Sequence, residues 1–530
     1  MNAIYIRKAE EGNVMASART NNVARNAWFA FIAQVINIVL SFLSRTVFIR
    51  LLGAEYLGVN GLFTNILTML SFAELGIGNA IIYNLYKPLA ENDQEKVKSL
   101  MALYEKAYKT IGCAIGLLGL LVMPFMGYIV KDAPNIDENI NFIYLLFLAN
   151  TVLSYFLVYK KSIITADQKN YIVSYYHQAL HVLQVILQTV FLILTGEYVV
   201  FLLIQIMCTA LSNIVLSKRA DKMYPFLVSG TAEPLAYEER QEIFADVRSL
   251  FMYKLGSVVL NGTDNLIISA LIGVAAVGLS SNYLLVIAAL GTIAGQVVGA
   301  FTASIGNLNA VADAERQERV FDCLFFICAW IYGYISVGLY MFLNPFINIW
   351  LGHDYLLSNG VVFALVLHFY INSVQFAAYT YRTTMGLFRQ GRLAPLFAAV
   401  LNIILSIGLA NSFGLTGIFL ATSIARFFTM GIVDPFLVYR IGFDKSPVPY
   451  YIKYFLFGSI FIGLYIGIDY ALSWIAVTSV LGLITKAVVM TVLFNGAMIL
   501  IFRNERNFKD IKRSLVSILR ENLTKLGLCE

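Results

Sequence analysis

The sequence predicts an all-α polytopic membrane protein of about 14 transmembrane helices. We expect two parallel six-helix repeats, related by a pseudo-twofold axis along the membrane normal, and two further C-terminal helices. Three observations carry this prediction. The 530 residues are 59% hydrophobic and only 13% charged, which is too little polar surface for a soluble protein of this size. Apolar runs recur from end to end, and the sequence resembles itself at a shift of about 220 residues.

The apolar runs divide the chain into fourteen expected spans with short polar loops between them. A helix needs about 20 apolar residues to cross a bilayer core of about 30 Å, which matches the length of these runs. The expected spans are 27–50, 60–82, 108–130, 141–160, 171–194, 198–217, 251–272, 280–304, 321–343, 359–380, 393–411, 415–438, 451–471 and 477–501.

Basic residues are concentrated in alternate loops, and this bias predicts the orientation. Loops rich in Lys and Arg stay on the cytoplasmic side of a membrane. The loops expected inside hold Lys160, Lys161, Arg382 and Arg440, for example, whereas those expected outside hold mostly acids. An even number of spans then places both termini in the cytoplasm.

The longest polar loop lies near the middle of the chain and suggests the domain boundaries. The expected segments are a cytoplasmic N-terminal segment 1–26, an N-terminal lobe 27–217, a cytoplasmic linker 218–250, a C-terminal lobe 251–438, a helix pair 451–501 and a cytoplasmic tail 502–530. The tail has apolar residues at helical spacing with basic residues between them. This pattern predicts an amphipathic helix on the inner membrane surface, with a solvated tail as the alternative.

The two halves share glycines as well as apolar runs. A shift of 220 residues places Gly53 on Gly273 and Gly58 on Gly278. We expect these glycines to form the tight outside turn between the first two helices of each half. Repeated halves that rock about a shared interface are a common transporter design, with the substrate site between them.

Each half also places a polar stripe on its first helix. Spacings of three, four and four residues put the members on one helix face. The first stripe is Gln34, Asn37, Ser41 and Arg45, and the second is Lys254, Ser257, Asn261 and Asn265. Polar groups that face hydrocarbon are costly, so both stripes should face the interior or water. We expect a substrate cavity lined by Gln34, Asn37, Ser41, Arg45, Asn261 and Asn265.

Two further features extend this expected cavity. His177, His181, Gln184 and Gln188 lie on one face of the fifth span, and Arg426 lies within the twelfth. Amide and imidazole groups can hydrogen-bond sugar hydroxyls, and arginine binds phosphate through forked donors. For any single neutral member, hydrogen bonding between helices is the alternative. The two histidines lack an identifiable third ligand, so we expect no metal site.

Glu74 and Asp264 are the acids that we expect well inside spans. A carboxylate removed from water can exchange a proton or bind a cation, so one of them is expected to couple transport to a proton or sodium gradient. The alternative is a structural partner for an arginine. Arg45 and Asp264 fall at similar depth on equivalent helices. We expect them to form a gate that opens when a substrate phosphate takes the place of the carboxylate beside Arg45.

Several motifs resemble one transporter family. The stretch "FIRLLGAEYLGVNGLFTNIL" followed by "AELGIGNAI" is similar to the first two helices of polysaccharide-type oligosaccharide flippases. These belong to the multidrug/oligosaccharidyl-lipid/polysaccharide (MOP) exporter superfamily. The stretch "FGLTGIFLATSIARFF" resembles the family's turn into the twelfth helix, and the similarity covers roughly residues 25–500.

This resemblance implies a transporter and not an enzyme. It implies fourteen helices, two lobes around a central cavity, and alternating access. The implied substrate is an undecaprenyl-diphosphate-linked oligosaccharide, carried from the inner to the outer leaflet of the bacterial plasma membrane for capsule or exopolysaccharide synthesis. The expected partners are this substrate, membrane lipid, a proton or sodium gradient, a polysaccharide polymerase and glycosyltransferases. We expect no cofactor and no nucleic acid.

Three other functions remain as alternatives. A multidrug exporter of the same superfamily would have fewer cations in its cavity, since its substrates are often cationic. A peptidoglycan-precursor flippase would carry several arginines in its first, second and eighth helices, whereas only Arg45 and Arg50 match here. A membrane glycan polymerase would need a large outside loop and paired catalytic carboxylates, neither of which is visible in the sequence. We therefore expect no catalytic residues.

Overall fold

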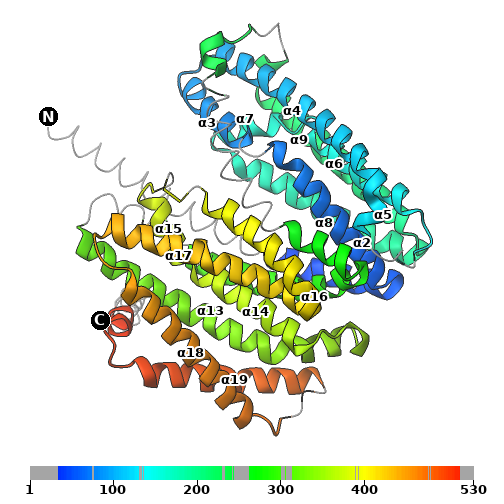
Figure 1. The fold of residues 1–530 in the computed structure, drawn as a ribbon. Helices are drawn as coiled ribbons and strands as arrows, with labels where there is room; N and C mark the ends of the chain where they lie inside the picture. The colour runs from blue at the N-terminus through cyan, green and yellow to red at the C-terminus, as the bar shows by residue number, and fades with distance from the viewer. Residues whose placement is uncertain are drawn as a thin grey trace, which may run out of the picture. The chain divides into compact units, whose positions relative to one another are not determined.

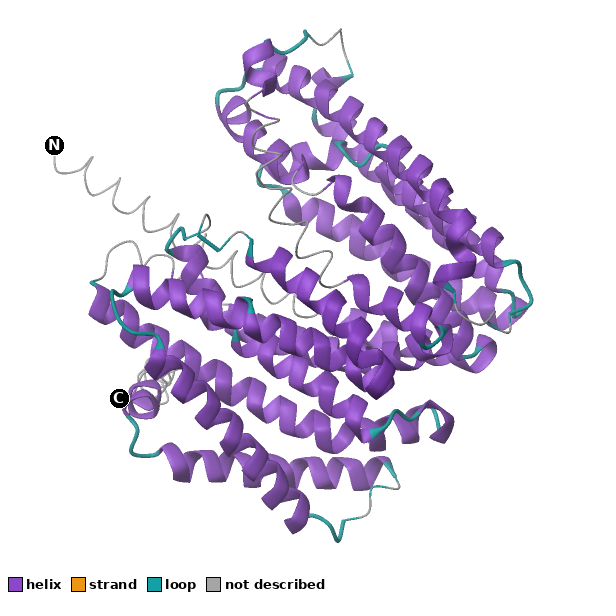
Figure 2. Ribbon diagram, in the orientation of Figure 1, coloured by secondary structure: helices purple, strands orange, loops and turns teal. Residues whose placement is uncertain are grey.

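The secondary structure is helical throughout the described chain, with no strand in it (Figure 2). The computed structural model describes residues 34–74, 77–130, 136–228, 233–241, 262–299, 313–387, 393–475 and 479–513, with a few single residues between these ranges. A helix pairs its own backbone N–H and C=O groups, which find no hydrogen-bond partner in hydrocarbon. The all-α fold predicted from the long apolar runs is confirmed.

Ten helices of the described chain are long and apolar enough to cross a membrane. They are Gln34–Leu52, Gln94–Ile129, Asn170–Thr195, Tyr198–Met223, Val274–Gly299, Ala314–Trp350, Asn359–Thr384, Ala394–Gly442, Val448–Ala471 and Val480–Phe502. An eleventh crossing is a bent pair, Ile140–Tyr155 and Lys160–Ala166, whose axes differ by 50°. Each overlaps one expected span, except Ala394–Gly442, which covers the two expected spans 393–411 and 415–438.

The other expected spans are interrupted or joined. The second corresponds to α2 (Ala54–Leu70) and α3 (Ile77–Ala90), which a short 3-10 turn separates. The seventh lies mostly outside the described residues, and its described part, 262–271, is helical. The eleventh lies almost wholly within α16 (Ala394–Phe428), and the twelfth begins in α16 and continues through α17 (Met430–Leu437). Within α16 only the non-helical backbone of Gly414 separates the two.

The chain forms two compact units made of discontinuous segments. The first unit holds the described residues of Met1–Gly53, Gly78–Gly116 and Phe142–Tyr237, and the second holds those of Ala54–Ile77, Leu117–Asn141 and Glu238–Glu530. Helix α2 comes from the N-terminal half of the sequence but packs within the second unit. The lobe boundaries expected on either side of 218–250 stay a prediction.

In the first unit, α8 (Asn170–Thr195) and α9 (Tyr198–Met223) lie side by side (Figure 1). Phe48, on the helix before them in the chain, packs edge-on against the rings of Tyr198 and Phe201, with centroid distances of 5.7 and 5.3 Å. This contact fixes the first described helix, Gln34–Leu52, to α9. The remaining helices include α4 (Gln94–Val122), α6 (Ile140–Tyr155) and α7 (Lys160–Ala166).

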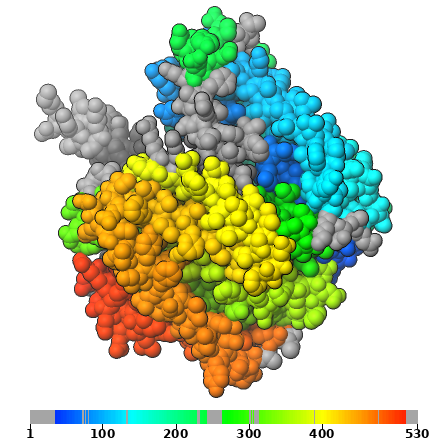
Figure 3. All heavy atoms as spheres, in the orientation of Figure 1, coloured from blue at the N-terminus to red at the C-terminus, as the bar shows by residue number. Residues whose placement is uncertain are grey.

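In the second unit, the 37-residue helix α13 (Ala314–Trp350) packs against five other helices (Figure 1). These are α11 (Val274–Gly299), α14 (Asn359–Val374), α15 (Phe376–Thr384), α18 (Val448–Ala471) and α19 (Val480–Phe502). Helix α17 (Met430–Leu437) follows α16 in the chain. Buried aliphatic and aromatic side chains from these helices form one continuous core. Phe427 of α16 meets Phe455 of α18, with ring centroids 5.7 Å apart. The segments that contain these helices, coloured yellow to orange, lie next to each other on the face seen in Figure 3.

The first glycine of each expected pair forms a turn, whereas the second glycines, Gly58 and Gly278, lie inside α2 and α11 instead of at the turn. Gly53 and Gly273 have backbone φ angles of +87° and +138°, a region that glycine enters without a side-chain clash. Each backbone N–H also caps the preceding helix, on the carbonyls of Ile49 and Ile268 at 2.9 Å. The helices that follow the two turns, α2 and α11, pack closely against each other. The repeat predicted from the sequence therefore extends to backbone geometry.

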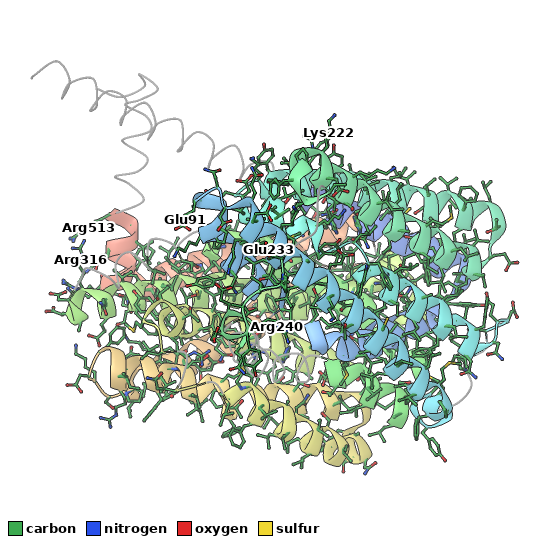
Figure 4. All side chains as sticks on the ribbon, turned by 90° about the horizontal axis from the view of Figure 1, so that it is seen from above. Glu91, Lys222, Glu233, Arg240, Arg316 and Arg513 are labelled. Carbon is green, nitrogen blue, oxygen red and sulfur yellow. The ribbon has the colours of Figure 1, made fainter. Side chains whose placement is uncertain are left out.

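The described start of the tail packs against α13. Phe508 stacks on Trp330 with ring centroids 5.9 Å apart, and Ile511 contacts the same core. Arg316 and Arg513 lie at one end of this unit, which is the end expected inside (Figure 4). The tail beyond residue 513, with most of its expected amphipathic face, lies outside the described residues.

Candidate functional site

A cavity of about 720 Å³ lies inside the second unit, among α11, α13, α14, α15 and α16. Its volume is typical of ligand pockets. The lining is mostly apolar and aromatic. Besides two tyrosines, its polar members are Thr292, His368, Asn372, Ser373, Gln375 and Arg426. None of these lining residues, all of which are described, is acidic. Arg426, which we expected at a substrate cavity, lines this cavity.

Arg426 is held in place by one hydrogen bond. Its Nε donates to Oε1 of Gln375 at 3.2 Å. Its two Nη atoms have no hydrogen-bond partner among the described residues. They remain available to a ligand in the cavity.

Behind Arg426 lies a buried ion pair that the sequence analysis missed. Gln375 donates from Nε2 to Oδ2 of Asp434 at 3.0 Å, and Oδ1 of Asp434 lies 3.2 Å from Nε of Arg382. Asp434 and Arg382 are 0% and 1% exposed. The expectation that only Glu74 and Asp264 are acids deep in spans is therefore wrong. Arg382 also differs from the expected loop cation, because it lies near the end of α15 and pairs inside the core.

Asp264 lies in a second polar cluster of the same unit. Its Oδ1 accepts a hydrogen bond from Nδ2 of Asn402 at 2.9 Å, and its Oδ2 accepts one from the hydroxyl of Thr422 at 2.9 Å. The Ser406 hydroxyl donates to Oδ1 of Asn402 at 3.0 Å, and Thr422 Oγ1 also lies 3.2 Å from the carbonyl oxygen of Ile418. No described cation pairs with Asp264. Four of these five residues lie on α16, on both sides of its kink.

In the first unit, the stripe on helix 34–52 packs partly against α8. Asn37 and Gln178 exchange two amide hydrogen bonds, at 3.1 and 2.6 Å. Gln34, Ser41 and Arg45 are half-buried on the same helix. For Asn37 the hydrogen bonds lie between helices, which is the alternative expected for single amides.

The four polar side chains expected on one face of α8 fall into two groups, the glutamines and the histidines. Gln184 donates to Gln188, and Gln188 in turn donates to the carbonyl of Phe201 on α9 at 3.1 Å. Gln188 thus joins α8 to α9, and Gln184 binds Gln188 within α8. His177 is exposed and His181 half-buried, and their rings stack with centroids 6.4 Å apart. Within the described chain they belong to no group of three His, Cys, Asp or Glu that could hold a metal ion.

Three further residues were expected at the site: Glu74, Asn265 and Asn261. Glu74 ends the 3-10 turn after α2 and is half-buried, so it lies at a helix break instead of inside a regular span. Asn265 is half-buried beside Asp264. Asn261 lies outside the described residues.

The sequence contains patterns that could have predicted part of these two polar clusters. Asn402 and Ser406 are four residues apart inside an expected span, and Asp434 lies inside the expected span 415–438. A polar pair at this spacing in an apolar helix indicates one polar face. Gln375 gave no such signal, because a single amide near a span end is common.

Two solved structures resemble this fold over most of the chain. One, described as the lipid II flippase MurJ in an inward closed conformation, has a TM-score of 0.65 and 14% identity, covering 89% of this chain and 98% of that chain. The other, an inward-facing multidrug resistance MATE family transporter of the MOP superfamily, has a TM-score of 0.57 and 13% identity, covering 75% of this chain and 93% of that chain. The chain shares the fold of these two proteins.

Sequence comparison adds no nearer relative. No family model matches the chain, and no curated protein matches it. At 13–14% identity, the two neighbours show the MOP fold and leave the substrate open.

Proposed function

We propose that this protein moves an undecaprenyl-diphosphate-linked oligosaccharide from the inner to the outer leaflet of the bacterial plasma membrane. The transport would proceed by alternating access and supply capsule or exopolysaccharide synthesis. The observation that carries the proposal is the positive cavity in the second unit. Arg426 presents free Nη atoms there, and the lining holds no acid. A cavity of this charge favours anions.

The charge of the cavity separates the main alternatives. A multidrug exporter with cationic substrates would place them beside Arg426, at a cost that grows as water is excluded. A lipid-linked diphosphate brings the opposite charge, and guanidinium groups bind phosphate through paired hydrogen bonds. The likeness to a structure named a lipid II flippase supports a lipid-linked substrate, and it keeps a peptidoglycan precursor as the second candidate.

Asp264 is the better supported of the two expected coupling residues. A carboxylate in an apolar core is costly unless a cation or a proton neutralises it, and no described cation does so. The carboxylate, the Asn402 amide oxygen and the Thr422 hydroxyl together offer oxygen atoms, which hard cations prefer. We therefore assign the coupling of transport to a proton or sodium gradient to Asp264, with Glu74 as the second candidate.

Reconstitution with two substrates tests this function. Proteoliposomes would carry an undecaprenyl-diphosphate-linked oligosaccharide in the inner leaflet, and an external lectin would detect its arrival outside. Ethidium, a cationic dye, would be the comparison substrate in the same vesicles. We expect protein-dependent appearance of the lipid-linked sugar and none of ethidium. Movement of ethidium without movement of the lipid would establish a drug exporter instead.

A further inference from the structure

The buried cluster of Arg382, Asp434, Gln375 and Arg426 holds one carboxylate for two guanidinium groups. Arg382 lies 3.2 Å from Asp434, whereas Arg426 reaches the same carboxylate only through the amide of Gln375. Asp434 interacts electrostatically with both guanidinium groups, and one carboxylate shared by two cations leaves a net charge of about +1 that it cannot compensate. An uncompensated charge with little water around it is costly, and an anion in the cavity would remove that cost.

A second polar group faces the same cavity. His368 lies on α14 and lines the cavity with Arg426, and its buried Nδ1 has no hydrogen-bond partner among the described residues. Asn372 and Ser373, one turn further along α14, add an amide and a hydroxyl to the lining. A ligand here meets hydrogen-bonding groups of several kinds as well as a cation.

The remaining walls are apolar, and part of them is aromatic. Tyr332, Phe369, Phe376 and Tyr379 line the cavity, and the rings of Tyr332 and Phe369 meet edge to face at 5.9 Å. Flat apolar rings suit the C–H faces of a pyranose, while amides and hydroxyls suit its equatorial hydroxyls. An alkyl chain would use the rings but leave His368, Asn372 and Arg426 without partners.

We propose that this cavity binds a sugar residue that carries an oxyanion, with the oxyanion on the Nη atoms of Arg426. The inference rests on the proposed function and deepens it, because it assigns the glycan end of the substrate to a pocket within one unit. The oxyanion has two chemical sources. One is the carboxylate of an acidic sugar, and the other is the diphosphate next to the first sugar.

Calorimetric binding to the purified full-length protein tests the proposal. The probes are a glucuronate-containing disaccharide, its neutral glucose counterpart, and pyrophosphate. We expect at least one anionic probe to bind more tightly than the neutral disaccharide. Preference for the glucuronate probe identifies a sugar carboxylate as the source, and preference for pyrophosphate identifies the lipid diphosphate.

Variants show whether Arg426 carries the preference. Arg426→Gln should weaken binding of the preferred anion by about tenfold to a hundredfold, the effect of losing charge-assisted hydrogen bonds. Arg426→Lys, which keeps the charge, should retain part of the affinity and guards against a folding defect. Lys445→Gln is the matched control, because Lys445 lies on an exposed loop, where a hydrogen bond to Glu318 raises its pKa.

Two results would overturn the proposal. One is equal binding of all three probes, and the other is an anion preference that survives in Arg426→Gln. Either result leaves the proposed function intact if lipid-linked sugar still crosses the vesicle membrane. Conversely, anion binding at Arg426 without transport of the lipid-linked sugar would remove the proposed function and keep the site.

Discussion

Gly58 of α2 contacts the start of α11 in the same way that Gly278 of α11 contacts the start of α2. A side-chain carbon on Gly58 would overlap the carbonyl of Val274, and one on Gly278 would overlap the carbonyl of Ala54. Both glycines and both carbonyl partners are 220 positions apart in the sequence. A contact in which each partner repeats the role of the other is the mark of twofold symmetry. The sequence repeat is thus expressed as a physical contact between α2 and α11.

Alanine at either glycine should loosen this contact. We expect Gly58→Ala and Gly278→Ala each to cost about 1–3 kcal/mol in the packed state, because a methyl group has no room beside a backbone carbonyl. Gly295→Ala is the matched control, since Gly295 lies on the same helix α11 with open space around it. Thermal unfolding in detergent measures all three. Equal midpoints for Gly278→Ala and Gly295→Ala would contradict the close contact.

Asp264→Asn should abolish the dependence of transport on an ion gradient. The neutral amide keeps the size of the side chain but has no charge for a cation or proton to neutralise. The measurement is sugar-lipid transport in proteoliposomes with an imposed proton gradient or an imposed sodium gradient. Asp354→Asn, which removes an exposed carboxylate, is the control and should leave the dependence unchanged. Full gradient dependence in Asp264→Asn would move the coupling site to Glu74 or elsewhere.

The buried Arg382–Asp434 pair should matter most when it is broken on one side. Asp434→Ala leaves Arg382 charged in the core and should lower stability by about 3–5 kcal/mol. Replacing both, as Arg382→Met with Asp434→Leu, should cost clearly less, because no charge is then left unpaired. Thermal unfolding midpoints compare the two variants. A double variant that is less stable than Asp434→Ala would show that the pair stabilises by more than mutual neutralisation.

The gate expected between Arg45 and Asp264 has a direct test. Asp264 accepts hydrogen bonds from Asn402 and Thr422 on its own side, so the gate requires Arg45 to compete with them. Cysteines at Ser44 and Asn265 should crosslink in at least one state of the transport cycle, and the added lipid-linked substrate should change the yield. Absence of crosslinking in every state would leave Arg45 as a phosphate ligand alone.

The sequence carries the fold because membrane spans obey local rules. Length, hydropathy and the repeated glycines predict helices and turns without knowledge of their neighbours, and Gly53 and Gly273 adopt the expected turn. The interruption after α2 and the run of α16 through Gly414 were not predicted, since hydropathy does not report where a helix breaks. Such breaks depend on packing by residues far away in the chain.

The candidate site was predictable only in part. Arg426 and Asp264 stood out because charges are rare in apolar spans. Their partners are single amides and hydroxyls, such as Gln375 and Asn402, which occur often in helices and become meaningful only when folding places them beside a charge. Arg382 was misread for the opposite reason, because a basic residue near a span end usually lies in a loop.

One measurement tests most directly whether α2 and α11 separate while a lipid-linked sugar is carried. A side-chain carbon at Gly61 would lie 3.3 Å from Cγ1 of Val277, which is a suitable separation for a disulfide between cysteines at these two positions. Lipid-linked oligosaccharide transport would be recorded in proteoliposomes with this disulfide formed and again after reduction. α2 and α11 belong to the predicted lobes 27–217 and 251–438. Alternating access by movement of these lobes requires transport to stop with the disulfide formed and to return on reduction. Transport at an unchanged rate with the disulfide fully formed would contradict it.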